Sequence, residues 1–255
     1  MRTRYCILAS GSRGNSIFLE ANDTRFLIDV GLSAKQIELR LKSRGVEPSS
    51  IDAIVLTHAH RDHVHGVGTF AQRHKVPVIG HPDTLDSITN LLKIGQEVLP
   101  KVDAFEFGGV RFKPFRVPHD CDPTHGYLIE TATKTFGICT DLGYVTGTVQ
   151  EHICRANILL LESNHDPEML NNGKYPWDLK QRIAGRFGHL SNQNAGELLY
   201  DIFGTQLDHI ILGHLSDENN TPELALKTVL RHVGDQYRSR FTVMVQKTVS
   251  DMFTA

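Results

Sequence analysis

The order of the expected elements predicts an α/β (α+β) fold, an αββα sandwich, with a single domain over residues 1–255. Strand-like and helix-spaced apolar segments follow one another as strands, helices, strands and helices. The chain has no internal repeat and no low-complexity linker that would mark a second domain. A hydrophobic content of 40% and a charged content of 22% are ordinary for a globular protein.

Apolar spacing and turn residues define the elements of the first half. The Asn-Asp pair at residues 22–23 is typical of a turn between two strands. Ser33 is expected to cap a helix whose apolar residues are Ile37, Leu39 and Leu41. We expect strands at residues 5–9, 16–21, 24–29, 52–57 and 76–80, and helices at residues 33–44, 66–74 and 82–93.

The second half continues with strands that end in polar residues, followed by helices. The apolar run at residues 158–161 is typical of a buried strand, and Pro222 fits the first turn of a helix. We expect strands at residues 110–117, 124–130, 134–139, 158–161, 209–213 and 241–245, and helices at residues 176–187, 192–203 and 221 to about 232.

In residues 54–63, an apolar strand is followed directly by several side chains of the types that bind metal ions. His58 and His60 are two residues apart, so an extended backbone projects both to one side. Asp62 and His63 follow at once, where a turn can aim them at a second position. Three imidazoles and a carboxylate suit borderline divalent cations such as zinc or manganese, so this stretch predicts a bound metal pair.

Other candidate ligands also stand at the ends of expected strands. His119 and Asp141 each follow one strand, and His214 follows another. Strand ends that share one edge of a sandwich bring such side chains together. Asp29 ends the third strand and could orient a ligating histidine, or it could be a helix cap or turn residue.

The His-x-His-x-Asp-His stretch resembles the signature of the metallo-β-lactamase superfamily. The resemblance implies an αββα sandwich with a dinuclear site, and it favours Asp29 as the residue that orients a histidine. It implies two divalent cations, zinc or manganese with iron also tolerated, which hold a bridging hydroxide as the nucleophile. It assigns the first cation to His58, His60 and His119, the second to Asp62, His63 and His214, and the bridging position to Asp141.

Two further residues resemble the nuclease side of this superfamily. Glu162 closes an apolar strand and His189 precedes a helix, as in the acidic and histidine motifs of β-CASP nucleases. The resemblance implies that His189 protonates the leaving oxygen while Glu162 holds its tautomer, with Asp62 as the third catalytic residue. A helix-capping histidine is the alternative for His189. The chain between Asp141 and His214 is too short for the inserted β-CASP domain.

The resemblance narrows to one group over nearly the whole chain. Residues 8–16, 162–166, 188–192 and 214–216 are similar to the small bacterial YycJ/WalJ-type exonucleases. That group implies a metal-dependent hydrolase, a 5′→3′ DNA exonuclease with a role in DNA repair. DNA with free 5′ ends is then the expected partner, and RNA is the alternative.

Residues 10–16 form a loop of small residues that could receive a 5′ phosphate. Its backbone N–H groups and hydroxyls could cradle an anion, and Arg13 adds a charge. An ordinary flexible loop is the alternative. The residues we expect to bind substrate here are Ser10, Ser12, Arg13 and Asn15.

Residues 171–190 form a basic segment in which Tyr175 and Trp177 lie among the cations. The segment contains four cationic residues, one of which is Lys174, and one acidic residue. Such a face can follow phosphates and stack bases, or it can be a solvated helix face with Trp177 anchored in the core. We count Lys174 and the earlier His165, which continues the polar end of the 158–161 strand, among the substrate-binding candidates.

Net charge, cysteine content and the length of apolar runs limit the possible partners and the cellular location. The net charge of −2 shows no global basic field. Four widely spaced cysteines without a CxxC motif fit reduced thiols, and no apolar run is long enough to cross a bilayer, so we expect a cytoplasmic protein with no membrane partner. The alternatives are an RNA-processing or small cyclic-nucleotide phosphodiesterase, a glyoxalase-like thioester hydrolase and a non-catalytic metal-stabilised binding protein.

Overall fold

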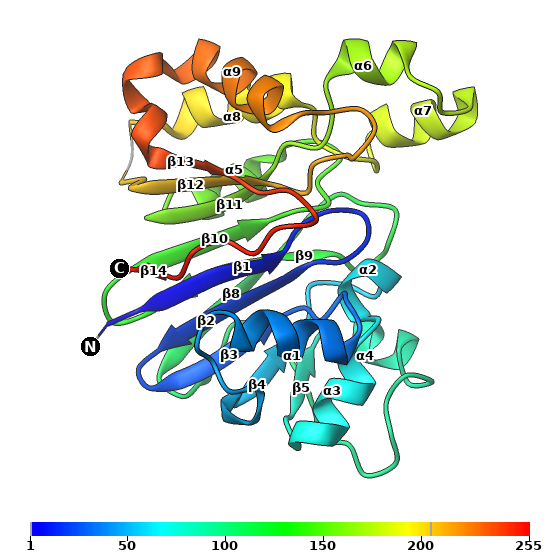
Figure 1. The fold of residues 1–255 in the computed structure, drawn as a ribbon, viewed down its shortest axis with the longest axis vertical. Coiled ribbons are helices and arrows are strands. Elements are labelled where there is room, and N and C mark those ends of the chain that lie inside the picture. Colours follow the sequence, from blue (N-terminus) through cyan, green and yellow to red (C-terminus); the bar gives the residue numbers. More distant parts are fainter. Residues whose placement is uncertain (1, 205) are drawn as a thin grey trace. The chain divides into compact units, whose positions relative to one another are not determined.

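The computed structural model describes residues 2–204 and 206–255 and divides the chain into two compact units. Unit 1 comprises Met1–Pro114, Ile129–Lys134 and Gln246–Ala255, and unit 2 comprises Phe115–Leu128 and Thr135–Val245. Figure 1 shows the helices and strands of the chain and labels most of them as in the text below. Within the described residues, no helix combines the length and apolar character needed to cross a membrane. The single domain over residues 1–255 stays a prediction.

A mixed sheet organises unit 1, in the order β14-β1-β2-β3-β4-β5-β6. Antiparallel pairing joins its first four strands, β14 (Phe253–Thr254), β1 (Arg4–Ala9), β2 (Ser16–Ala21) and β3 (Thr24–Ile28). Parallel pairing continues from β3 into β4 (Ala53–Val55), β5 (Val78–Gly80) and β6 (Val98–Pro100). Asn22 and Asp23 have φ of 51° and 62°, as the predicted tight turn requires.

Short helices bury one face against this sheet. They are α1 (Ala34–Lys42), η1 (Pro48–Ser50), α2 (Arg61–Val64), α3 (Val67–His74) and α4 (Pro82–Ser87). Ile37 and Phe70 pack with Ile54 in the core, and Ser33 caps α1 as predicted. Leu39, the third apolar residue of the predicted helix, has a side chain that is 53% exposed. Two residues after Ile37, it points away from the face that Ile37 buries.

Helix α4 ends at Ser87, whereas the sequence predicted a helix over residues 82–93. A Cβ on Gly68 of α3 would lie 1.7 Å from the Leu91 carbonyl oxygen, so the turn after α4 packs directly on α3. This contact competes with continued helix formation. The sequence also missed β6 and β7 (Phe105–Phe107), because three residues are too few to establish a strand pattern.

Unit 2 is built on parallel strands in the order β13-β12-β11-β10. They are β10 (Thr135–Cys139), β11 (Ile158–Glu162), β12 (His209–Gly213) and β13 (Phe241–Val243). Strand β7 pairs with β8 (Val110–Arg116), and the chain passes between the units within β8 and β9 (His125–Glu130).

The helices of unit 2 connect these strands. They are α5 (Gly147–Ile153), α6 (Pro167–Asn172), α7 (Trp177–Ala184), α8 (Asn192–Ile202), α9 (Pro222–Val233) and η2 (Asp235–Arg240). Leu199 of α8 and Val229 of α9 pack on Leu161 and Leu212 of the sheet, and Figure 1 shows α8 and α9 side by side over it. Helices α5 and α6 were not predicted. The carboxyl ends of the parallel strands carry the candidate site residues.

Candidate functional site

The first cluster lies just beyond the end of β4 in unit 1. The chain remains extended at His60, which is the N-cap of α2, so Asp62 and His63 stand in the first turn of that helix. The rings of His58 and His63 are 4.1 Å apart between centroids, and those of His58 and His60 are 4.9 Å apart. The strand-then-turn geometry expected from the sequence therefore gathers these imidazoles.

Asp29 anchors this cluster from the end of β3. Its Oδ2 accepts a 2.7 Å hydrogen bond from Nδ1 of His63, and both its oxygens accept bonds from Thr57 at 2.8–2.9 Å. Asp29 and His63 are buried. The carboxylate keeps the proton on Nδ1, so Nε2 carries the lone pair that a cation would use. No sequence pattern predicted this role of Thr57.

The loop at residues 10–16 is held by hydrogen bonds within itself and to Asp62 and Gln246. The backbone N–H of Gly11 donates to Oδ1 of Asn15, that of Arg13 to Gln246, that of Gly14 to Gly11, and that of Asn15 to Asp62. These N–H groups are not available to cradle an anion, contrary to the expectation. The exposed residues of the loop are Ser12 and Arg13.

Two of the loop's substrate-binding candidates are buried. Ser10 is 1% exposed and Asn15 is 7% exposed. The Asn15 side-chain N–H₂ lies 3.2 Å from Oδ2 of Asp62 and 2.9 Å from Nε2 of His63. Asn15 therefore orients candidate ligands rather than facing solvent. The contact could not be predicted from the sequence, because Asn15 and Asp62 are 47 residues apart in the chain.

The second cluster lies at the strand ends of unit 2. Ligand atoms of Asp141, Glu162, His189 and His214 all lie within 4.8 Å of one another. Oδ1 of Asp141 is 3.5 Å from Nε2 of His214 and 3.7 Å from Nε2 of His119. Carboxylate and imidazole groups at these distances form a donor set suited to a divalent cation.

Glu162 is fully buried, and both its oxygens accept hydrogen bonds. Oε1 accepts from Nδ1 of His189 and from Nδ1 of His214, each at 2.8 Å. Oε2 accepts from the backbone N–H groups of Leu142 at 2.6 Å and Leu190 at 3.3 Å. Burial would raise the pKa of Glu162, but the two histidines outweigh it and hold that pKa below its usual range. Glu162 is therefore an anion that orients two imidazoles.

His189 is the most accessible member of this cluster. Its side chain is 23% exposed, whereas those of Asp141 and His214 are 2% exposed. Burial would lower the pKa of His189, but the Glu162 carboxylate outweighs burial and raises it. The N-cap of α8 is Ser191, whose hydroxyl accepts the backbone N–H of Asn194, so His189 is not needed as a cap.

Three candidate residues at strand ends have left-handed backbones. Asp29, Asp141 and His214 have φ of 62°, 58° and 55°. This conformation is uncommon for residues other than glycine and often marks functional positions. It turns each side chain out of the strand direction at the point where the strand ends. No sequence pattern predicted these dihedrals.

His119 is oriented by the segment after α7. Its Nδ1 donates to the carbonyl of Gly188 at 3.0 Å, which directs Nε2 toward Asp141. Asp120 lies 3.3 Å from the same Nε2 and also pairs with Arg182 of α7 at 2.6 Å. Asp120 was not predicted as a site residue, although its position beside His119 was a signal.

A buried polar network holds the loops that carry the second cluster. Ser163 donates to Oδ1 of Asn192 at 2.6 Å, and Asn220 donates to the carbonyls of Ser163 and Asn164 at 2.8 and 3.0 Å. Asn164 donates in turn to the His214 carbonyl at 2.9 Å. Hydrogen-bonded networks of this kind rigidify a site. Asn220 lies far from the other members in sequence and was not predicted.

The last two substrate-binding candidates differ in exposure. His165 is 3% exposed, and burial lowers its pKa to about 4, so it is neutral near pH 7. Lys174 is exposed in the connection between α6 and α7. Trp177 is 68% exposed, so the interpretation that anchored it in the core is wrong.

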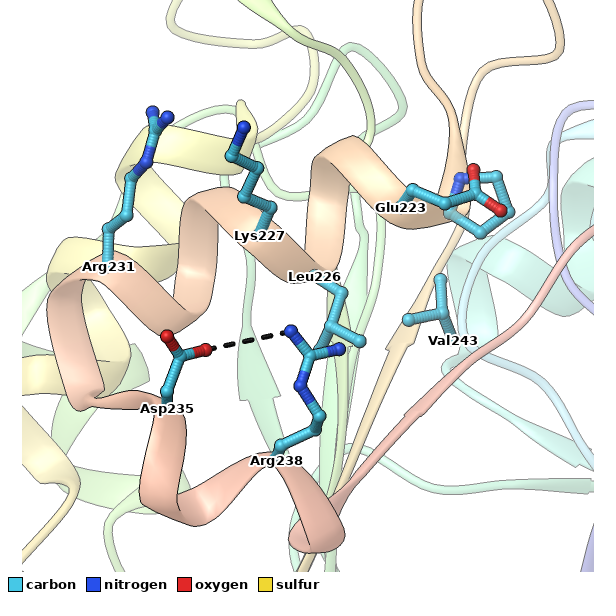
Figure 2. A pocket seen from close by; sticks show the side chains of 8 residues that line it. Glu223, Leu226, Lys227, Arg231, Asp235, Arg238 and Val243 are labelled. Atoms are coloured by element: carbon cyan, nitrogen blue, oxygen red, sulfur yellow. Dashed lines mark ion pairs between the residues drawn. The ribbon is translucent and has the colours of Figure 1, made fainter.

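A cavity of about 680 Å³ lies beside α9 in unit 2. Figure 2 shows Lys227, Arg231 and Arg238 around it, with Arg238 paired to Asp235 at 3.6 Å. None of its lining residues is a candidate site residue. The candidate chemistry therefore lies at the strand ends and not in this cavity.

Comparisons with known proteins agree on one family. A family model described as a beta-lactamase superfamily domain matches residues 24–214. The chain is 38% identical over 237 residues to the exodeoxyribonuclease WalJ of Streptococcus pneumoniae serotype 2, covering 91% of this chain and 88% of that protein. It is 34% identical over 233 residues to the exodeoxyribonuclease YycJ of Bacillus anthracis, covering 90% and 88%.

A solved structure supports the same fold. The metallo-beta-lactamase fold protein YhfI from Bacillus subtilis matches with a TM-score of 0.73 and 15% identity, over 98% of this chain and 99% of that one. At this identity the likeness shows the fold, and it confirms the sandwich architecture predicted from the sequence.

Proposed function

Because the chain belongs to the beta-lactamase superfamily, we propose that it is a metal-dependent 5′→3′ DNA exonuclease that uses its histidine and aspartate residues at strand ends. The observation that carries this proposal is the hydrogen bond between Glu162 and His189 beside Asp141 and His214. A hydrolase that releases a poor leaving oxygen needs such an oriented acid. The names of two relatives that match 90% or more of the chain support DNA as the substrate.

The donor set fits two divalent cations. Imidazole nitrogens and carboxylate oxygens suit zinc and manganese, and they tolerate iron. When bound, a pair of such cations activates water and neutralises charge on a phosphoryl group. We propose the ligands predicted from the sequence, namely His58, His60 and His119 for one cation, Asp62, His63 and His214 for the other, and Asp141 between them.

The protein's own residues then divide the remaining tasks. Asp29 and Glu162 keep the Nδ1 protons on His63 and His214, so that Nε2 of each imidazole can bind a cation. Glu162 also stabilises the protonated form of His189, which donates its Nε2 proton to the leaving oxygen. Asp62, held by Asn15, serves as ligand and catalytic residue.

The exposure of the candidate side chains indicates which of them can contact the substrate. Ser12 and Arg13 are the exposed side chains of the loop at residues 10–16, and we propose that they bind a 5′ phosphate. Lys174 is placed to contact the DNA backbone, and buried His165 shapes the site beside Glu162. Thioester hydrolysis is less well supported, because its leaving group needs no acid such as His189.

We place this activity in DNA repair in the cytoplasm. Within the described part of the chain, the four cysteines form no disulfide bond, which fits a reducing compartment.

The decisive experiment is digestion of end-labelled DNA that carries either a 5′-phosphate or a 5′-hydroxyl, beside matched RNA and a generic phosphodiester. The protein is stripped of metal and resupplied with Mn²⁺ or Zn²⁺, and Asp62→Ala is the control. Stepwise release from the 5′ end of DNA, absent in Asp62→Ala, is the expected result. Cleavage of the generic ester without cleavage of DNA would overturn the DNA assignment while leaving the metal centre intact.

A further inference from the structure

Helix α7 and the segment that follows it expose two large aromatic side chains. None of the eight residues of α7 is buried. Trp177 at its start is 68% exposed, and Phe187, three residues after its end, is 59% exposed. Large aromatic side chains are costly to leave in water, so an exposed pair on one short segment points to a binding surface. We call Trp177, Phe187 and the exposed cations Lys174 and Arg186 the α7 surface.

The charge of the α7 surface favours an anionic partner. Arg186 lies over the ring of Tyr144, with its guanidinium carbon 4.5 Å from the ring centroid, so its position is held while its charge stays at the surface. Arg182 is neutralised by Asp120, whereas the exposed Lys174 and Arg186, which lie close in sequence to the two aromatics, outnumber the exposed Asp178 of α7. Aromatic faces interleaved with cations are the combination that binds unpaired bases and their phosphates.

The α7 surface leads directly into the candidate catalytic residues. The backbone N–H of His189 donates to the Ile183 carbonyl of α7 at 2.8 Å, so the end of the helix sets the position of His189. A Cβ on Gly143 would lie 2.1 Å from the Arg186 carbonyl oxygen, so the segment that carries Phe187 packs tightly against the loop after Asp141. A strand lying on α7 would therefore pass next to His189.

We propose that the α7 surface binds the single strand of the DNA substrate, with unpaired bases stacked on Trp177 and Phe187 and phosphates near Lys174 and Arg186. This inference rests on the proposed nuclease function and specifies its substrate as unpaired DNA at this surface. A paired duplex keeps its base faces stacked inside the helix and cannot use the two aromatics. An acidic peptide could pair with the cations but offers no stacking partner to both rings.

Trp177 is the single tryptophan of the chain, which makes the test specific. We would titrate a single-stranded oligothymidine into the Asp62→Ala variant of the whole chain, which we expect to bind DNA without cleaving it, and follow tryptophan fluorescence. Stacking of a base on Trp177 should quench this emission in a saturable way. A blunt duplex of equal length should leave it nearly unchanged.

Variants with intact catalytic residues give the kinetic test. Trp177→Ala and Phe187→Ala should each raise KM for single-stranded DNA about ten-fold with little change in kcat, because the lost contact is stacking. Tyr200→Ala removes an aromatic that is 67% exposed on α8 and should change neither constant. Lys174→Ala should weaken binding more than Lys227→Ala, which removes a cation beside the α9 cavity.

The outcomes separate this inference from the proposed function. Digestion of DNA with no fluorescence change and unaltered KM in Trp177→Ala would overturn the inference and leave the nuclease standing. Quenching without digestion in the wild-type protein would instead overturn the nuclease and keep the binding surface. Emission that shifts with protein concentration alone, together with a dimer by gel filtration, would assign the α7 surface to a second copy of the chain and overturn the inference.

Discussion

Oε1 of Glu162 lies 2.8 Å from Nδ1 of His189, and the same oxygen lies 2.8 Å from Nδ1 of His214. One buried carboxylate thus orients a proposed metal ligand and a proposed acid together. Asp29 plays the matching part in unit 1, where it orients His63. Each cluster contains a strand-end carboxylate that sets histidine tautomers, and this arrangement supports several predictions.

Replacement of His189 should separate acid catalysis from metal binding. We expect His189→Ala to lower kcat by about 10²- to 10⁴-fold, the usual contribution of a general acid, with metal content unchanged. Metal analysis of the purified variant is the check. A parallel loss of metal would mean that His189 is a ligand, since it belongs to a group of four residues close enough to hold a cation.

Asp29→Asn should weaken metal binding without unfolding the protein. The amide keeps the shape of the side chain but removes the charge that holds the proton on His63. Loss of such an orienting carboxylate typically lowers metal affinity by about 10- to 100-fold, which competition with a chelator would measure. Asp23→Asn, in the turn between β2 and β3, is the matched control and should bind metal normally.

Arg13→Ala should remove the preference for a 5′-phosphorylated end. We expect KM for 5′-phosphorylated DNA to rise about ten-fold, because a charge-assisted bond to phosphate is lost, and KM for 5′-hydroxyl DNA to stay the same. Lys42→Ala, which removes an exposed cation of α1, serves as the control for net charge. An unchanged ratio between the two substrates would exclude Arg13 from 5′ recognition.

Glu20 should make the stability of unit 1 depend on pH. It lies on β2 directly opposite Arg4 of β1 and Arg25 of β3. Hydrogen bonds from Arg4, and then those from Arg25, hold the pKa of Glu20 below its ordinary value of 4.5. The stabilisation is therefore complete above pH 4.5 and is lost as the pH falls through the lower, folded-state pKa.

Chemical denaturation of wild-type protein and Glu20→Gln would test this. At pH 7 the wild type should be more stable by about 1 kcal/mol, a modest value because the arginines are partly exposed. The difference should shrink as the pH falls below 4.5. A difference that persists at strongly acidic pH would show that packing, and not charge, stabilises the three strands.

The sequence by itself determined the regular core and the local half of the site. His58, His60, Asp62 and His63 are neighbours in the chain, so strand and turn geometry alone predicted that they gather. The strands after which Asp141, Glu162 and His214 stand were also predicted, because their apolar runs are unambiguous. Secondary structure was missed where elements are short, as at β6 and α6.

Only the tertiary structure decided how those side chains are held and which surfaces remain open. Periodicity does not show whether an apolar side chain finds a neighbour, so Leu39 and Trp177 could not be placed in advance. Hydrogen bonds between distant segments, such as that of Asn15 with Asp62, leave no local pattern. The left-handed backbone at Asp141 likewise depends on surrounding contacts rather than on its neighbours in sequence. Residue types and spacing therefore determined which chemical groups the site contains. Long-range packing determined how those side chains are oriented.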